Sequence, residues 1–84
     1  MVEVQWSIKA TKQVLKLETS DKAAVYEAVE GLKEFPYLQN VKKLTGHEYQ
    51  YRLRVGNFRV LFDFDGMARI VSIEEVRKRD KNTY

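Results

Sequence analysis

The sequence predicts a small α+β domain in which two helices pack on one face of an antiparallel sheet. Three observations support this fold class. Apolar residues recur near helical spacing in the first third of the chain, apolar and polar residues alternate in several segments of the second half, and two glycine-containing dipeptides separate those segments. The 84 residues suffice for one domain. We therefore expect residues 1–84 to form a single unit in the order strand, helix, helix, strand, strand, strand.

The composition excludes several classes of protein. The chain has no cysteine and one histidine, His47, so disulfides and thiolate metal sites are excluded, and we expect neither a metal nor a cofactor. No apolar run approaches the roughly 18 residues of a membrane helix, so we expect no membrane association and a cytoplasmic location. The net charge is +3, and four basic residues lie among the last eight. This distribution favours an anionic partner such as RNA or DNA.

The first half of the chain is expected to supply one strand and both helices. Residues 2–6 alternate, which predicts a strand with three inward side chains: Val2, Val4 and Trp6. Ser7 can cap a helix whose apolar positions are Ile8, Thr11, Val14, Leu15 and Leu17. A second N-cap is expected within residues 19–21. The helix that follows should run to about Phe35, before Pro36, with a buried stripe of Val25, Ala28, Val29 and Leu32.

The second half is expected to supply three strands. Residues 36–47 should form a connecting loop that carries a basic pair, Lys42 and Lys43. Gly56-Asn57 is a signal for a two-residue hairpin turn within the segment YRLRVGNFRVLF, residues 51–62. That turn fixes the register: Val55 opposite Phe58, Arg54 opposite Arg59, Leu53 opposite Val60, and Tyr51 opposite Phe62. A second hairpin signal, Asp65-Gly66, precedes a strand over residues 68–76.

The predicted register gathers three arginines. Because apolar side chains occupy one face of the hairpin, Arg52, Arg54 and Arg59 share the other. Like charges directly opposite one another destabilise a sheet. One interpretation is that these side chains are solvated or paired with a carboxylate such as Asp63. The other is a preorganised anion site, because guanidinium groups on rigid strands match the geometry of a phosphate.

The C-terminal segment adds cations and one aromatic side chain. Arg77, Lys78, Arg79 and Lys81 precede Tyr84. Basic residues beside an aromatic ring that stacks on bases are typical of proteins that bind single-stranded RNA, whereas a basic chain end alone is most often solvated. His47 lies in the expected loop, outside this group, where a histidine is more often exposed than catalytic.

These motifs resemble those of the RelE-like toxins of bacterial toxin–antitoxin systems. The resemblance covers essentially the whole chain. The residues that carry it are Lys42, Leu44 and Gly46 before the hairpin, Tyr51, Arg52, Arg54, Gly56, Phe58 and Arg59 within it, and Arg77, Lys78, Arg79 and Tyr84 after it. The hairpin motif is specific to the superfamily and much less specific to one activity within it.

The resemblance implies a ribosome-dependent mRNA interferase, an endoribonuclease that cuts mRNA in the ribosomal A site by attack of a 2′-hydroxyl on the adjacent phosphate. The resemblance assigns phosphate binding and charge stabilisation to Arg52, Arg54 and Arg59. It gives Tyr84 the role of base stacking or of general base, and the acid would be Arg77, Lys78 or Arg79, of which Lys78 releases a proton most readily. Further RNA contacts would come from Lys42, Lys43, Arg77 and Lys81.

The resemblance also implies partners and rival functions. A cognate antitoxin is expected to bind the toxin, and the complex would bind operator DNA through the antitoxin, in the cytoplasm of a bacterium or archaeon. The ParE branch of the superfamily shares the fold and inhibits DNA gyrase without cutting RNA, so gyrase inhibition is an alternative activity. A third alternative is an inactive member that retains only antitoxin binding.

Overall fold

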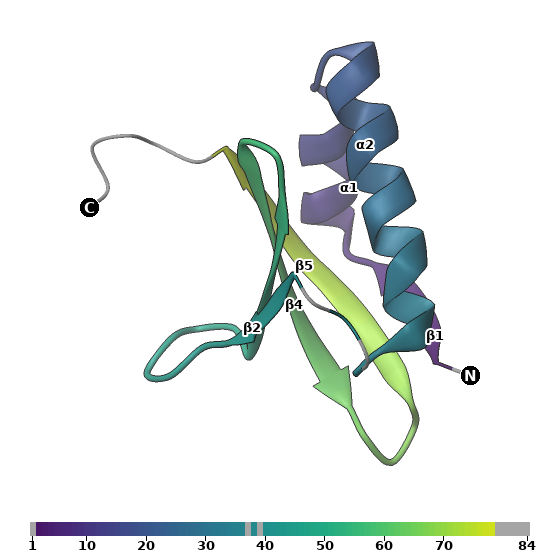
Figure 1. Cartoon of the computed structure of the whole chain (residues 1–84), viewed down its shortest axis with the longest axis vertical. Helices are drawn as coiled ribbons and strands as arrows, with labels where there is room; N and C mark the ends of the chain where they lie inside the picture. The colour runs from purple at the N-terminus through teal and green to yellow at the C-terminus, as the bar shows by residue number, and fades with distance from the viewer. Residues whose placement is uncertain (1, 37, 39, 79–84) are drawn as a thin grey trace.

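The computed structural model describes residues 2–36, 38 and 40–78. The elements are β1 (Glu3–Trp6), α1 (Ile8–Leu15), α2 (Thr19–Glu30), the 3₁₀ helix η1 (Gly31–Glu34), β2 (Val41–Lys43), β3 (Tyr51–Val55), β4 (Phe58–Asp65) and β5 (Ile70–Lys78). The strands form one sheet in the order β1-β5-β4-β3-β2. Both α-helices lie on the same side of this sheet (Figure 1). The α+β class and the placement of the helices are therefore confirmed.

The core lies between the helices and the sheet. Helical residues contribute Ala10, Val14, Val25, Val29 and Leu32, and the strands contribute Leu53, Val55, Phe58, Val60, Phe62, Val71, Ile73 and Val76. The ring of Phe35 packs edge-on against the rings of Tyr51 and Phe62, with centroids 5.0 and 5.7 Å away. Full burial of a side chain such as Phe62 contributes roughly 1.5–3 kcal/mol to folding. These contacts make the sheet a rigid support for its opposite face.

The hairpin between β3 and β4 has the predicted register. Val55 is opposite Phe58, Arg54 opposite Arg59, Leu53 opposite Val60, and Tyr51 opposite Phe62. Gly56 has φ 54°, in the left-handed region that glycine enters without steric cost. Because one side of the hairpin is buried in the core, its arginines lie on the side of the sheet opposite the helices, which we call the arginine face.

Two features of the sheet differ from the expectation. Residues 41–43, expected within a loop, form the edge strand β2, which pairs antiparallel with β3. Three residues are too few to show a period of two, so the alternation that identifies strands gave no signal there. In addition, β1 pairs parallel with β5, with Glu3 opposite Ile70, so the sheet is mixed. This pairing joins distant parts of the chain and leaves no local turn motif in the sequence.

The first helix begins as predicted but packs differently. Ser7 caps α1, and its Oγ accepts a hydrogen bond from the N–H of Ala10 at 3.0 Å. Two of the apolar positions noted in the sequence, Ile8 and Leu15, are 76% and 56% exposed. Ala10 and Val14 form the buried side of the helix instead. The buried side of α1 is therefore narrower than the set of apolar positions in its sequence.

The second helix starts one residue early and changes type before its end. Glu18 occupies the N-cap position of α2 without a capping hydrogen bond from its side chain, so the predicted cap within residues 19–21 was wrong. The α-helix ends at Glu30 and continues as η1 to Glu34. Val25, Val29 and Leu32 are buried as predicted. Within the described residues, neither helix has the length and apolarity needed to cross a bilayer.

Candidate nucleic-acid interface

A row of three arginines crosses the arginine face. Arg54 of β3 is opposite Arg59 of β4, and Arg59 is opposite Arg77 of β5. Side chains of directly opposite residues lie on the same face, with Cβ atoms about 4.5–5.5 Å apart. The sheet therefore holds these three side chains, the arginine row, next to one another. Arg54 and Arg59 were predicted to be neighbours, and the structure adds Arg77.

A second row of side chains lies parallel to the first on the same face. Lys42 of β2 is opposite Arg52 of β3, Arg52 is opposite Leu61 of β4, and Leu61 is opposite Glu75 of β5. Arg52, Leu61 and Glu75 each lie two residues along their strand from a member of the arginine row. The row thus begins with two cations and ends with a carboxylate. Leu61 and Glu75 are only 3% and 6% exposed, although no helix of the described chain covers this face.

Three cations border a depression at the β2–β3 edge of the arginine face. Its volume is about 290 Å³, and it is lined by Asn40, Val41, Lys42, Arg52 and Arg54. The Nε atom of Arg52 is buried there and has no hydrogen-bond partner within the described residues. Lys42, Arg52 and Arg54 form no ion pair with any described carboxylate. Cations that form no ion pair with a described carboxylate are suited to bind the oxygens of a phosphate.

Arg77 at the other end of the row is paired with a buried carboxylate. Its Nε and Nη2 donate hydrogen bonds to Oε1 and Oε2 of Glu75 at 2.7 and 3.0 Å. The Nζ of Lys9, in α1, lies 3.6 Å from Oε2 of Glu75. The hydrogen bonds from Arg77 hold the pKa of Glu75 below its usual range despite its burial. Both carboxylate oxygens are therefore occupied by cationic donors.

The loop between β2 and β3 also reaches this carboxylate. Burial and a hydrogen bond to Glu75 raise the pKa of Tyr49 to about 12, so its phenol is neutral at physiological pH. The backbone N–H of Tyr49 donates a hydrogen bond to Nδ1 of His47 at 3.1 Å, and the two rings lie 6.0 Å apart. His47 itself is exposed. The loop thus places one aromatic side chain, Tyr49, against β5 at the end of the second row.

The remaining predicted site residues are distributed differently. Lys78 is opposite Phe58, a core residue, so the register places Lys78 on the helix side of the sheet, away from the arginine row. Lys43 is opposite Tyr51, whose ring packs against the core. Arg79, Lys81 and Tyr84 lie outside the described residues, so their roles stay predictions. Within the described residues, no group of three side chains is arranged to bind a metal ion.

Asp63, considered as a partner for an arginine, has other neighbours. Its Oδ1 accepts a hydrogen bond from the backbone N–H of Gln50 at 2.8 Å. It also lies close to Glu74, and burial together with the negative charge of Asp63 raises the pKa of Glu74. Sequence reasoning singled out neither Glu75 nor Tyr49. The only sequence signal for Glu75 is its position two residues before Arg77 in the same strand.

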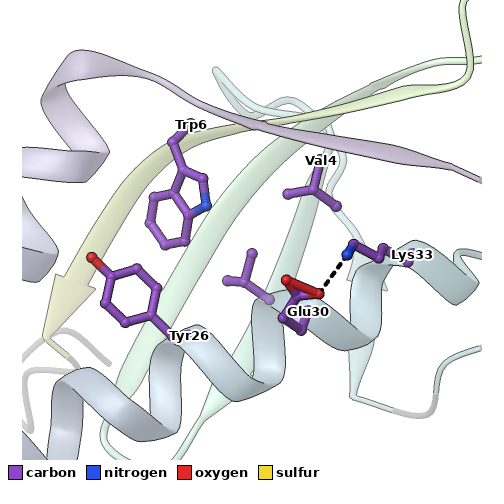
Figure 2. A pocket seen from close by; sticks show the side chains of 6 residues that line it. Val4, Trp6, Tyr26, Glu30 and Lys33 are labelled. Atoms are coloured by element: carbon purple, nitrogen blue, oxygen red, sulfur yellow. Dashed lines mark ion pairs between the residues drawn. The ribbon is translucent and has the colours of Figure 1, made fainter.

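A larger cavity lies on the opposite side of the sheet. It has a volume of about 400 Å³, opens between β1 and α2, and is lined by Val4, Trp6, Tyr26, Val29, Glu30 and Lys33 (Figure 2). Trp6 and Tyr26 meet edge-on with ring centroids 5.4 Å apart. Lys33 and Glu30 form an ion pair of 2.7 Å at its border. The one cation in its lining, Lys33, is paired with Glu30, so this cavity differs from the depression on the arginine face.

The fold and the site together define a class of protein. Two helices on one face of a mixed five-stranded sheet are the architecture of the RelE/ParE superfamily of type II toxins. The family model described as the ParE toxin of the type II toxin–antitoxin system parDE matches residues 4–83, and the chain belongs to this family. A sequence search of curated proteins finds no match.

Solved toxin structures share the fold. The RelE–RelB complex from Pyrococcus horikoshii matches with 21% identity and a TM-score of 0.81, covering 95% of this chain and 97% of that chain. The RelBE2 complex from Mycobacterium tuberculosis matches with 28% identity and a TM-score of 0.78, covering 93% and 98%. The isolated E. coli RelE toxin matches with 16% identity and a TM-score of 0.81, covering 99% and 89%. The family model is described as ParE and these structures as RelE, so the similarity extends to both branches of the superfamily.

Proposed function

We propose that this toxin is a ribosome-dependent mRNA interferase. The observation that carries the proposal is the arginine row, in which Arg54, Arg59 and Arg77 are directly opposite one another across three strands. Like charges directly opposite one another destabilise a sheet, a cost that Glu75 offsets at the Arg77 end of the row and that a bound phosphate would offset further. Attack of a 2′-hydroxyl on the adjacent phosphate creates a phosphorane with added negative charge. Guanidinium groups already held in place stabilise that charge without reorganising during the reaction.

The proposed roles follow the positions of the side chains. Arg59, in the middle of the row, contacts the scissile phosphate together with Arg54 and Arg52. Arg77 completes the row, so among the basic residues near the end of β5 the register favours Arg77 over Lys78 as the cation closest to the phosphate. Tyr84 and one of the neighbouring basic residues supply base stacking and proton transfer, as the resemblance implies. The further contacts to RNA are those proposed for Lys42, Lys43 and Lys81.

We also propose that an antitoxin of the RelB kind binds this toxin. The structures from P. horikoshii and M. tuberculosis are complexes of a RelE-type toxin with its antitoxin. An acidic segment lying over the arginine face would neutralise its cations and exclude RNA. In this proposal the complex is cytoplasmic and binds operator DNA through the antitoxin.

The second candidate function is inhibition of DNA gyrase, and the match to the ParE family model favours it. A gyrase inhibitor acts by binding and has no cleavage step. The two activities therefore differ in what happens to mRNA in cells that express the toxin.

Primer extension on mRNA from expressing cells tests the proposal. We expect cuts in phase with codons that require translation, and Arg59→Ala should lower the cleavage rate by ~10²–10³ because it removes a donor from a preorganised site. Lys12→Ala is the matched control, since it removes one positive charge from an exposed position of α1. That variant should cut like the wild type. Intact mRNA with gyrase-dependent DNA damage would support the second candidate, and wild-type cleavage by Arg59→Ala would refute the assigned site.

A further inference from the structure

A carboxylate lies buried within a surface that otherwise presents cations. Glu75 is 6% exposed and lies on the arginine face, two residues from Arg77 in β5. A negative charge at this position repels a phosphate, and its burial is unfavourable unless partners compensate it. Electrostatics alone would therefore favour a neutral residue in a site for nucleic acid. A favourable interaction of Glu75 with its neighbours must therefore offset both the repulsion of phosphate and the cost of burial.

That contribution is visible in the contact between Glu75 and Arg77. Two donors of one guanidinium group, Nε and Nη2, bind the two oxygens of the carboxylate. This geometry fixes the plane of the guanidinium group as well as its position. The side chain of Arg77 is 47% exposed and that of Glu75 is 8% exposed, so the carboxylate lies beneath the guanidinium group. Both N–H groups of Nη1 remain outside this pair and are able to bind another acceptor.

Glu75 also connects two segments that lie outside the sheet. Lys9 approaches it from α1, and Tyr49 approaches it from the loop that leads into β3. Tyr49 lies three residues before Arg52, the second cation of the parallel row. The carboxylate thus lies against Arg77, and it also contacts α1 and the loop that leads into β3.

We propose that Glu75 is a positioning residue, which holds Arg77 beside Arg59 so that both guanidinium groups bind one phosphate of an unpaired RNA strand. This inference rests on the proposed function, because it assumes RNA as the ligand. Arginine side chains have many rotamers, and a guanidinium group fixed before binding loses less conformational freedom when the phosphate arrives. Glu75 therefore improves binding through orientation although its charge opposes binding.

The sign of the effect of Glu75→Gln tests the proposal. If charge alone mattered, removal of the carboxylate would tighten RNA binding. If Glu75 positions Arg77, the same variant binds more weakly, by about 10-fold, which corresponds to the loss of one charge-assisted hydrogen bond. The measurement is fluorescence anisotropy of a labelled single-stranded RNA with purified toxin, at several salt concentrations, alongside single-turnover cleavage in a translation reaction.

The matched control is Glu74→Gln, which removes a neighbouring carboxylate that forms no ion pair with a described cation. We expect this control to bind RNA as tightly as the wild type or more tightly. In an Arg77→Ala background, Glu75→Gln should cause no further weakening, because the side chain that it positions is absent. If Glu75→Gln does not fold, as judged by circular dichroism, Arg77→Lys serves instead, since lysine keeps the charge but cannot form the two-point contact. We expect the same loss of RNA affinity.

Two failures can be told apart. Wild-type protein that binds RNA but does not cut it would refute the proposed interferase activity. The RNA affinity of Glu75→Gln relative to that of the wild type would still test the role of Glu75. The inference would be overturned if Glu75→Gln folds and binds RNA as tightly as the wild type. It would also be overturned if Glu75→Gln weakens RNA binding equally in the wild-type and Arg77→Ala backgrounds. Wild-type protein that does not bind RNA would overturn both.

Discussion

Glu75 contacts charged or polar side chains from α1, β5 and the β2–β3 loop, so its ionisation is coupled to folding. Its pKa in the folded protein lies below 4.5, the value of an unperturbed glutamate. The stabilisation by the ionised carboxylate is therefore fully present above pH 4.5 and is lost as the pH falls through the folded-state pKa. At the residue scale, this carboxylate contributes both to the site and to the acid stability of the fold.

We predict that Glu75→Gln lowers the free energy of unfolding at neutral pH and lowers it less in acid. The reason is that protonated Glu75 and glutamine have the same charge, so the difference between the two proteins shrinks when the carboxylate is protonated. Urea unfolding curves at pH 7 and at about pH 3 measure the two differences. A difference that is equal at both pH values would show that the charge of Glu75 does not stabilise the fold.

Tyr49 gives a second prediction at the residue scale, at the alkaline end. Its pKa in the folded protein is about 12, raised by burial and by the hydrogen bond to Glu75. The neutral phenol is stabilised, so this contribution is present below pH 10 and is lost as the pH rises toward 12. An absorbance titration of tyrosinate should show a component near pH 12 that Tyr49→Phe lacks. Identical titration curves for the two proteins would rule out the contact.

At the scale of elements, the β3–β4 hairpin depends on one backbone conformation. Gly56 has φ 54°, and a Cβ added there would meet no atom within 4 Å, so a substitution changes conformational energy without a clash. We predict that Gly56→Ala destabilises the fold by about 1–2 kcal/mol, the cost of a left-handed conformation for an L-residue. Urea unfolding measures the change.

Gly31→Ala is the matched control for this prediction. Gly31 has φ −62° and is also free of contacts to an added Cβ. Alanine adopts this conformation readily and restricts the unfolded chain, so the control should be neutral or slightly stabilising. Equal destabilisation by both substitutions would contradict the role assigned to the turn.

The junction between β1 and α1 gives a further prediction at this scale. The Oγ of Ser7 accepts a hydrogen bond from the N–H of Ala10 and donates one to the carbonyl oxygen of Glu74, each at 3.0 Å. Ser7→Ala removes both bonds and should cost about 1–2 kcal/mol. Ser20→Ala, at an exposed position in the first turn of α2, is the control and should change stability by less than about 0.5 kcal/mol. Thermal unfolding measures both variants, and a comparable loss of stability in Ser7→Ala and Ser20→Ala would refute the capping role of Ser7.

Local turn chemistry explains which elements the sequence predicts. The β3–β4 register follows from one glycine and a strict period of two, and Arg54 and Arg59 could be placed opposite each other on that basis. The neighbouring pair of strands, β4 and β5, contains a register shift between Leu61 and Phe62. Counting from the turn at Asp65 without that shift would place Val76 opposite Arg59. The position of Arg77 in the row, and that of Glu75 beside it, therefore could not be predicted from the sequence.

The packing of α1 was unpredictable for a different reason. Helical periodicity identifies an apolar side of a helix but does not show how closely the helix approaches the sheet. Ala10 and Val14 are buried, whereas Ile8 and Leu15 lie outside the core. Likewise, β2 is an element only because β3 offers hydrogen-bonding groups along its free edge. Tertiary contacts decide both features.

At the scale of the whole molecule, the distribution of charge predicts a strong effect of salt. The net charge is +3, and the arginine face gathers Lys42, Arg52, Arg54, Arg59 and Arg77 against Glu75. RNA binding should weaken as salt rises, with a slope of roughly −0.7 per phosphate contact on logarithmic axes. Arg54→Ala should make the slope shallower by the contribution of about one phosphate contact, and Lys12→Ala should leave the slope unchanged. Equal slopes for Arg54→Ala and the wild type would exclude a phosphate contact at Arg54.

The parallel pairing of β1 with β5 also has a consequence for biosynthesis. The strand translated first acquires its neighbour only when residues 70–78 have left the exit tunnel, and pairings between such distant segments form slowly. A growing polypeptide therefore cannot assemble a complete cationic surface while most of it is being made. If the toxin acts on translation, the ribosome that makes it meets no complete cationic surface before β5 has been translated.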